Sequence, residues 1–213
     1  MTPPENFDGK YEFDLLISSY NSIGDKSRLE IVTDETIKSV TRESLVEGLQ
    51  IDFTEGDFSL QNLFNVKQNI GSFYICQCLF DFGTSYRVGR YGEDFTHRYH
   101  YDIVGFGTMK VDLGNTLLRQ KTMGDKLVDH FIHSTIRIDG CEIFNDKFYL
   151  TSDKKENVVM FFDTNFVDAI SKYDGLSIKA KENKMYLVFE NHLEETQAKV
   201  VEDIFGSFKY WSD

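Results

Sequence analysis

The run Phe73–Phe80, written FYICQCLF, constrains the fold more than any other stretch of the chain. Its alternate residues Tyr74, Cys76, Cys78 and Phe80 share one side if the run is a β-strand. We predict that both cysteines are buried and unbridged, because a free cysteine behaves as a small hydrophobic residue. The chain has 3 cysteines, an odd number that forms neither a disulfide framework nor a zinc motif.

A second run, FTHRYHYDIV at 95–104, is rich in aromatic and β-branched residues and follows a glycine-containing loop predicted at 83–92. We predict a strand antiparallel to the first. Residues three apart on a strand face opposite ways, so His97 is expected on the aromatic side and His100 on the solvent side beside Asp102. If the segment were helical instead, the two histidines would converge.

His97, His100 and Asp102 are nevertheless the catalytic candidates, because a histidine beside a carboxylate can act as a general acid or base. Other catalytic motifs are missing: the sequence has no G-x-S-x-G, no H-E-x-x-H and no EF-hand loop. Gly105-Phe-Gly107 lacks the third glycine of a dinucleotide loop and predicts a strand irregularity. The sequence predicts no cofactor.

A second histidine pair, His130 and His133, lies in a segment that predicts a helix over 124–133 with Asp125 as its N-cap. Both histidines fall on the polar side of that helix together with Lys126. Two imidazoles could hold an ion there, but a closed site needs further ligands, and a lysine opposes a cation. We therefore predict no tightly bound metal, and at most a weak surface site at these two histidines.

Charge and hydropathy limit the classes of partner that the chain can bind. Acidic residues outnumber basic ones by 35 to 23, a net charge of −12 that disfavours nucleic acid and anionic membranes. No apolar run approaches the roughly 18 residues of a membrane helix, and the start MTPPENFDGK has no signal-type apolar core. We expect a soluble, cytoplasmic protein without direct membrane insertion.

The predicted fold class is α+β, an antiparallel sheet with helices packed on one side. Its earlier elements are strands at 11–18 and 29–32, a helix at 34–48, strands at 71–82 and 95–106, and a further strand at 109–118. The length predicts a single domain over 1–213, or two lobes at 1–135 and 136–213.

The last third predicts a unit of strand, helix, hairpin and helix. The strand is at 147–151, the helix at 164–173 with Asp163 as its N-cap, and the hairpin pairs 176–180 with 185–189. A terminal helix beginning near Glu194 is expected to bury Val200, Val201 and Ile204.

The segment 142–190 carries a resemblance through Phe144-Asn-Asp-Lys-Phe148, Asp153, Phe162-Asp-Thr and Lys184-Met-Tyr-Leu-Val. It resembles the closing half of an uncharacterised bacterial and archaeal domain family that is often tethered after membrane helices. Upstream, Leu79-Phe-Asp81 is similar to the start of that family's hairpin, so the resemblance covers about 79–206. It implies an α+β domain with no assigned activity and no catalytic residues to transfer. The chain departs from the family in lacking a membrane segment.

Two kinds of function remain. The polar residues map onto solvated faces, which favours a non-enzymatic binding module whose partner is another protein. The alternative is a metal-assisted or acid–base hydrolase that uses His97, His100 or Asp102. A deep pocket lined by the loop 83–94, with His97 facing in, would favour the enzyme. The sequence leaves the oligomeric state open.

Overall fold

The computed structural model describes residues 28–50, 57–68, 71–88, 92–122, 124–125, 135–189 and 196–207, together with residues 18 and 21. Within these ranges, the side chains of residues 28, 68 and 81–100 lie outside the description. The strand predicted at 11–18 falls almost entirely outside it.

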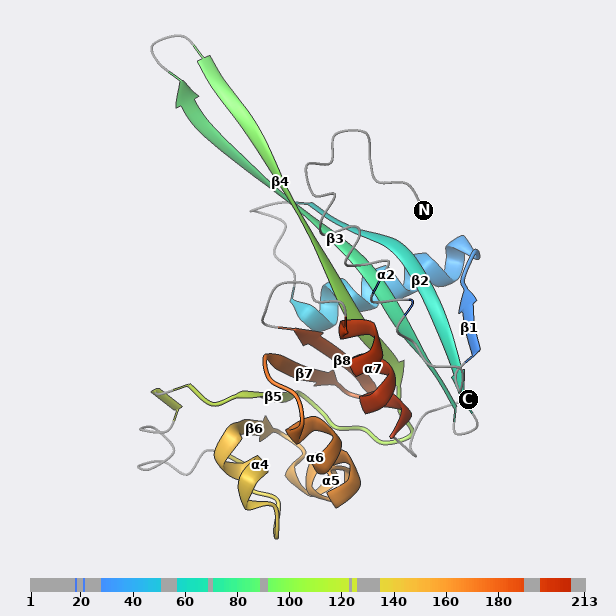
Figure 1. Cartoon of the computed structure of the whole chain (residues 1–213), viewed down its shortest axis with the longest axis vertical. Coiled ribbons are helices and arrows are strands. Elements are labelled where there is room, and N and C mark those ends of the chain that lie inside the picture. The colour runs from blue at the N-terminus through green and yellow to red at the C-terminus, as the bar shows by residue number, and fades with distance from the viewer. Residues whose placement is uncertain are drawn as a thin grey trace.

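One antiparallel sheet of 8 strands forms the centre of the described structure, in the order β1-β2-β3-β4-β8-β7-β5-β6 (Figure 1). The strands are β1 (Arg28–Ile31), β2 (Asp57–Gln68), β3 (Gly71–Val88), β4 (Gly92–Thr108), β5 (Thr116–Gln120), β6 (Phe148–Ser152), β7 (Leu176–Lys181) and β8 (Lys184–Phe189). The α+β class with an antiparallel sheet is confirmed. Strands β4 and β8 pair at the middle of the sheet, so it joins segments far apart in the sequence.

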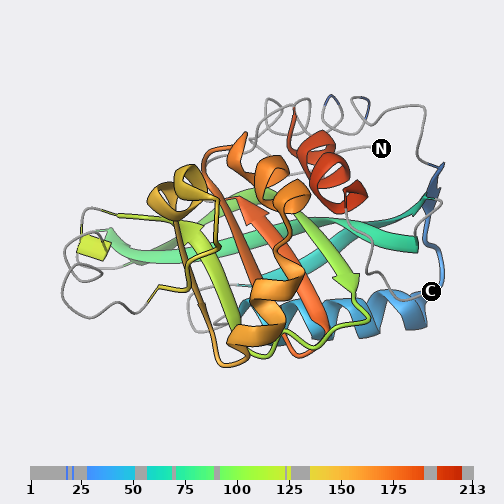
Figure 2. The ribbon, with the colours of Figure 1, turned by 90° about the horizontal axis from the view of Figure 1, so that it is seen from below.

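The helices lie on both faces of this sheet. They are α2 (Glu35–Leu49), α4 (Glu142–Lys147), α5 (Lys155–Phe161), α6 (Thr164–Ser171) and α7 (Gln197–Gly206). Buried residues of α4 to α7 pack in one core with Ile75, Ile103 and Leu187 of the sheet. We expected helices on one side; four are there, and Leu45 of α2 packs on the opposite face with Cys76 and Cys78. Figure 2 shows α2 on the other side of the sheet from α6 and α7.

Helix α2 is held at both ends by polar contacts. Asp34 caps its start by accepting from the Thr36 N–H at 2.8 Å. At the other end, Lys179 donates to the Leu49 carbonyl at 3.1 Å, and Lys181 donates to Glu47 at 2.6 Å. The lysines of β7 therefore bind the C-terminal end of α2, where cations complement the helix dipole.

The predicted C-terminal unit is confirmed in its main parts. Asp163 accepts from the Phe166 N–H at 2.9 Å and begins α6. Gly175 has φ of +65°, a conformation that suits glycine after a helix end. Helix α7 buries Val200, Val201 and Ile204 as expected, but begins at Gln197.

Other predictions were incomplete or wrong. The strand placed at 109–118 is β5, and it begins only at Thr116. Helices α4 and α5 were not predicted. Asp125 is not the N-cap: its carboxylate accepts from the Thr122 N–H at 2.7 Å, and its own N–H donates to Thr122 Oγ1 at 3.2 Å. Thr122 and Asp125 thus bond to each other reciprocally, in the pattern of a capping box. Residues 126–133 of the predicted helix lie outside the described residues.

Candidate functional site

The hairpin of β3 and β4 projects beyond the rest of the sheet. Its pairs continue from Phe82 opposite Arg98 to Val88 opposite Gly92 without a register shift. The last pair between β2 and β3 joins Asp57 to Asp81. We call residues 82–88 and 92–98 the arm; at about 3.3 Å per residue it is about 20 Å long. Figure 1 shows the arm extending away from the body of the molecule.

The arm corrects the loop predicted at 83–92. Both strands continue through most of that stretch, and β3 ends only at Val88. No described strand pairs with the outer edge of β4 between Gly92 and Val104, because β8 begins to pair at Gly105. Among the described strands, the arm therefore presents main-chain N–H and C=O groups along an edge that no other strand covers.

The three catalytic candidates all lie on β4, and the prediction of a strand at 95–104 is confirmed. His97 is within the arm opposite Gly83, and His100 is at its root opposite Phe80. Their backbone positions have opposite parity, so the strand does not bring them to one face. Both side chains lie outside the described residues, so the environments predicted for them stay predictions.

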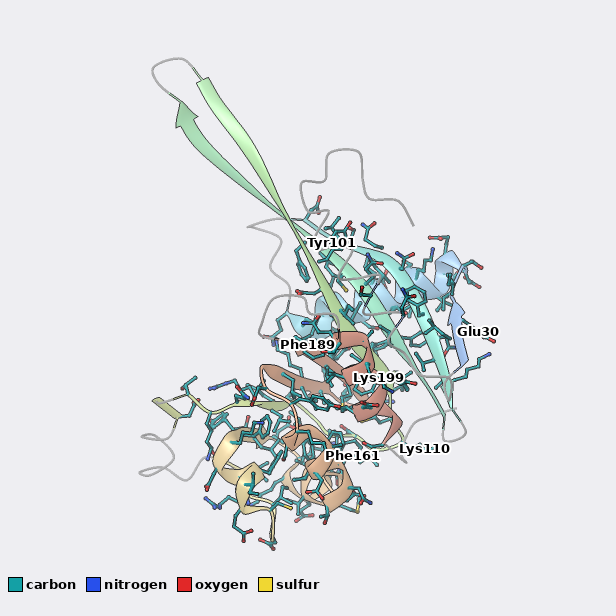
Figure 3. All side chains as sticks on the ribbon, in the orientation of Figure 1. Glu30, Tyr101, Lys110, Phe161, Phe189 and Lys199 are labelled. Carbon is teal, nitrogen blue, oxygen red and sulfur yellow. The ribbon has the colours of Figure 1, made fainter. Side chains whose placement is uncertain are left out.

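Asp102 is half-buried and pairs across the strands with Cys78. Tyr101 beside it is buried on the opposite face and marks the root of the arm in Figure 3. Burial, with smaller effects from Cys76 and Asp102, raises the pKa of Cys78 well above its ordinary value. A thiol held in its neutral form is neither a nucleophile nor a metal ligand. The prediction that Cys76 and Cys78 are buried and unbridged is confirmed.

Gly105 has a packing role that the sequence did not predict. A Cβ there would lie 2.7 Å from Val201 Cγ1 and 3.1 Å from Phe205 Cζ, both on α7. β4 pairs with β3 as far as Phe106 and with β8 from Gly105 to Thr108 without a register shift, so the expected irregularity is wrong. The glycine allows α7 to approach the sheet where β8 begins to pair with β4.

The metal candidates His130 and His133 lie outside the described residues, so that prediction is not tested. Across the described residues, no three His, Cys, Asp or Glu side chains are grouped so that they could hold a metal ion.

A polar cavity of about 600 Å³ lies among the loops that follow β4, β6 and β7. Its lining residues include Lys110, Asp112, Asn115, Asp153, Lys154 and Glu182. Asp153 accepts from the main-chain N–H of Asn115 at 2.8 Å and from its side-chain amide at 2.9 Å. These contacts hold the loop before β5 against the end of β6.

Two of the charged residues that line this cavity, Asp112 and Lys154, form an ion pair. Lys154 donates to Asp112 at 2.5 Å, which lowers the pKa of Asp112 and raises that of Lys154. Both shifts favour the charged forms. A general acid needs a raised carboxyl pKa and a lysine base a lowered one. The arrangement is that of an ion pair that closes two loops.

Comparisons of the chain with protein-family models, with curated proteins and with solved structures gave no match. In the part of the chain that the structure describes, no helix is both long and apolar enough to cross a membrane.

The arm is the element that sequence reasoning missed. The signal was present in the alternation of FYICQCLF and FTHRYHYDIV, two runs on either side of a stretch without proline. Gly83 was interpreted as the start of a loop, but a glycine opposite His97 is compatible with an extended strand.

Proposed function

We propose that the chain is a non-enzymatic, soluble, cytoplasmic module that binds another protein chain, and that the arm is its binding element. The arm itself carries this proposal, since β3 and β4 continue as a pair beyond the last residues that either joins to another described strand. An extended segment can add to such an edge, because main-chain hydrogen bonds supply affinity without a deep pocket.

Four further observations agree with a binding role. The ion pair of the polar cavity stabilises loops, and its pKa shifts oppose acid–base catalysis. The net charge of −12 favours a protein over a nucleic acid as the partner. The unbridged cysteines support a reducing compartment. The resemblance of residues 79–206 to a family without assigned catalytic residues points the same way.

A variant without the arm tests this proposal. Phe82 and Arg98 are a cross-strand pair, so a two-residue Asn-Gly turn can replace residues 83–97 and close the shortened hairpin. The full chain and this variant are immobilised and incubated with extract of the source cells, and each captured protein is purified and titrated calorimetrically. We expect the full chain to bind its partner at least about tenfold more tightly than the variant does.

The alternative function gives a different result. If the chain is instead a hydrolase that uses His100 or Asp102, the variant without residues 83–97 should bind the captured protein as tightly as the full chain does. The full chain should then hydrolyse an ester, phosphoester or peptide from a substrate panel. That activity would fall in Asp102→Asn or His100→Ala. Either result contradicts the binding proposal.

A further inference from the structure

The outer edge of β4 in the arm has charged residues but lacks proline, lysine and a bulge, three of the devices that protect a strand edge. Such edges are usually blunted by proline, by lysine or by a bulge. Residues 82–98 contain neither proline nor lysine. The β3–β4 pairing has no register shift, whereas β2 and β3 shift between Leu60 and Asn62. The arm is therefore a template without a bulge for a further strand.

We propose that this strand is the same arm of a second copy, and that the two β4 edges pair antiparallel about a two-fold axis at Thr96. The inference rests on the proposed function and deepens it, since it names the bound chain. A two-fold interface uses the same residues from both copies, so one edge sequence must be complementary to itself.

The sequence of β4 satisfies that condition at Thr96. Antiparallel identical strands pair residues at equal distances on either side of the axis, and residues directly opposite share a face. With the axis at Thr96, Asp94 lies opposite Arg98 of the second copy, and by symmetry this pair forms twice. Opposite charges facing across strands stabilise a sheet.

Neighbouring registers are less favourable. An axis at Asp94 or at Arg98 places that residue opposite itself, and like charges directly opposite are destabilising. An axis at His97 places Asp94 opposite His100 and loses both pairs with Arg98. Among axes within residues 92–98 of the arm, charge complementarity therefore selects the one at Thr96. An axis at His100, outside the arm, would pair Arg98 with Asp102.

The pairing inside the arm makes this register testable. Asp94 is opposite Tyr86 within the arm, and Arg98 is opposite Phe82. Reversing either charge therefore creates no like-charge pair within one copy. Glu93 differs, because it is opposite Arg87, so its reversal disturbs the arm without touching the proposed charge pairs.

Sedimentation equilibrium of the full chain is the first test. We expect a dimer for the wild type, dissociation that is about tenfold easier for Asp94→Arg and for Arg98→Asp, and recovery when both changes are combined. The control Glu93→Arg should stay within about threefold of wild type. A monomeric wild type, or a double variant as weak as the single ones, overturns the register.

Disulfide trapping is the second test, in a Cys141→Ser background. Directly opposite residues of an antiparallel pair have Cα atoms about 4.5–5.5 Å apart, within reach of a disulfide. Thr96→Cys should form a covalent dimer under mild oxidation, whereas Thr84→Cys, its partner on β3, should not. Cross-linking by His97→Cys and not by Thr96→Cys overturns the axis at Thr96.

The outcomes separate this inference from the proposed function. A monomeric wild type that captures a different protein through its arm overturns self-pairing and supports the binding module. A dimer that persists after the arm is shortened overturns self-pairing through the arm.

Discussion

Two hairpins of the same sheet have opposite surroundings. The hairpin of β7 and β8 is short, closes at Lys181 opposite Lys184, and lies between β4 and β5 with strands on both sides. The arm is formed by the same alternation of residues, but no other described strand pairs with either of its outer edges. Leu176 and Leu187 of the short hairpin are fully buried. A hairpin with strands on both sides contributes to the stability of the fold, whereas a hairpin with unpaired outer edges can bind a further strand.

A substitution in the β7–β8 hairpin should therefore lower the free energy of unfolding far more than removal of the arm does. Leu187 is 0% exposed and lies in the core under α7. Leu187→Ala removes buried methyl groups and leaves a cavity, so it should lower the free energy of unfolding by about 2–5 kcal/mol. Urea denaturation monitored by circular dichroism measures this change.

Shortening the arm should cost far less, because an isolated two-stranded hairpin is marginally stable at best. We expect replacement of 83–97 to change the free energy of unfolding by less than about 1 kcal/mol at a concentration where both proteins are monomeric. The exposed Ile143 offers a matched control for the alanine substitution, since it is 78% exposed. Comparable losses from Leu187→Ala and from the shortened arm would contradict the comparison.

Gly105 lies where the open part of β4 meets its covered part. Gly105→Val would place side-chain atoms against Val201 and Phe205, which already approach within 2.7 and 3.1 Å of an added Cβ. Overpacking of this kind typically costs about 1–3 kcal/mol. The melting temperature should fall accordingly.

Gly124→Ala is the control for that substitution, because an added Cβ there would meet only Thr122 Oγ1 at 3.7 Å. It should leave the melting temperature unchanged or slightly raised. A harmless valine at Gly105 would mean that α7 moves away from the sheet without loss.

Removal of the N-cap of α6 should have a smaller effect on the free energy of unfolding. Asp163→Ala removes the acceptor for the Phe166 N–H and should cost about 0.5–2 kcal/mol. Asp168 is exposed on the same helix, and Asp168→Ala should do little. Equal losses in thermal melts of the two variants would show that the cap contributes nothing beyond charge.

The elements that sequence predicted are those fixed by local signals. Asp163, Gly175 and the hairpin at 176–189 follow from a cap, a stop and a polar turn, each decided within a few residues. The strand predicted at 29–32 and the helix predicted at 34–48 also correspond to β1 and α2, although Ile37 and Val40 of α2 are exposed.

The elements that sequence missed depend on distant neighbours. β5 pairs with β6 and β7, which follow much later in the chain, so its start could not be judged from its own residues. The arm depends on where β2 and β8 stop, which no feature of β3 or β4 reveals. Of the candidate site, sequence found the strand at 95–104 but not its projection.

The smallest expected effect is a pH dependence of the stability contributed by the contact between Arg119 and Asp125. Arg119 donates two hydrogen bonds to Asp125, at 2.6 and 2.8 Å, and with Thr122 it holds the pKa of Asp125 well below the usual range. A depressed pKa in the folded state means that protons bind the unfolded chain first, near an ordinary pKa of about 3.9. The stabilisation is therefore complete above about pH 5 and is lost as the pH falls below about 4.

Thermal melts from pH 7 to pH 3 compare wild type with Asp125→Asn. We expect a difference worth up to about 1 kcal/mol at pH 7 that narrows toward pH 3, since the asparagine cannot titrate. Asp112→Asn is the matched control: the Asp112 and Lys154 side chains are 44% and 46% exposed, against 14% and 28% for Asp125 and Arg119, so solvent screens that pair more. Its difference from wild type should be smaller at every pH. If the melting temperatures of wild type and Asp125→Asn change in parallel with pH, the charge of Asp125 contributes nothing to stability. The contact with Arg119 would then hold the loop by geometry alone.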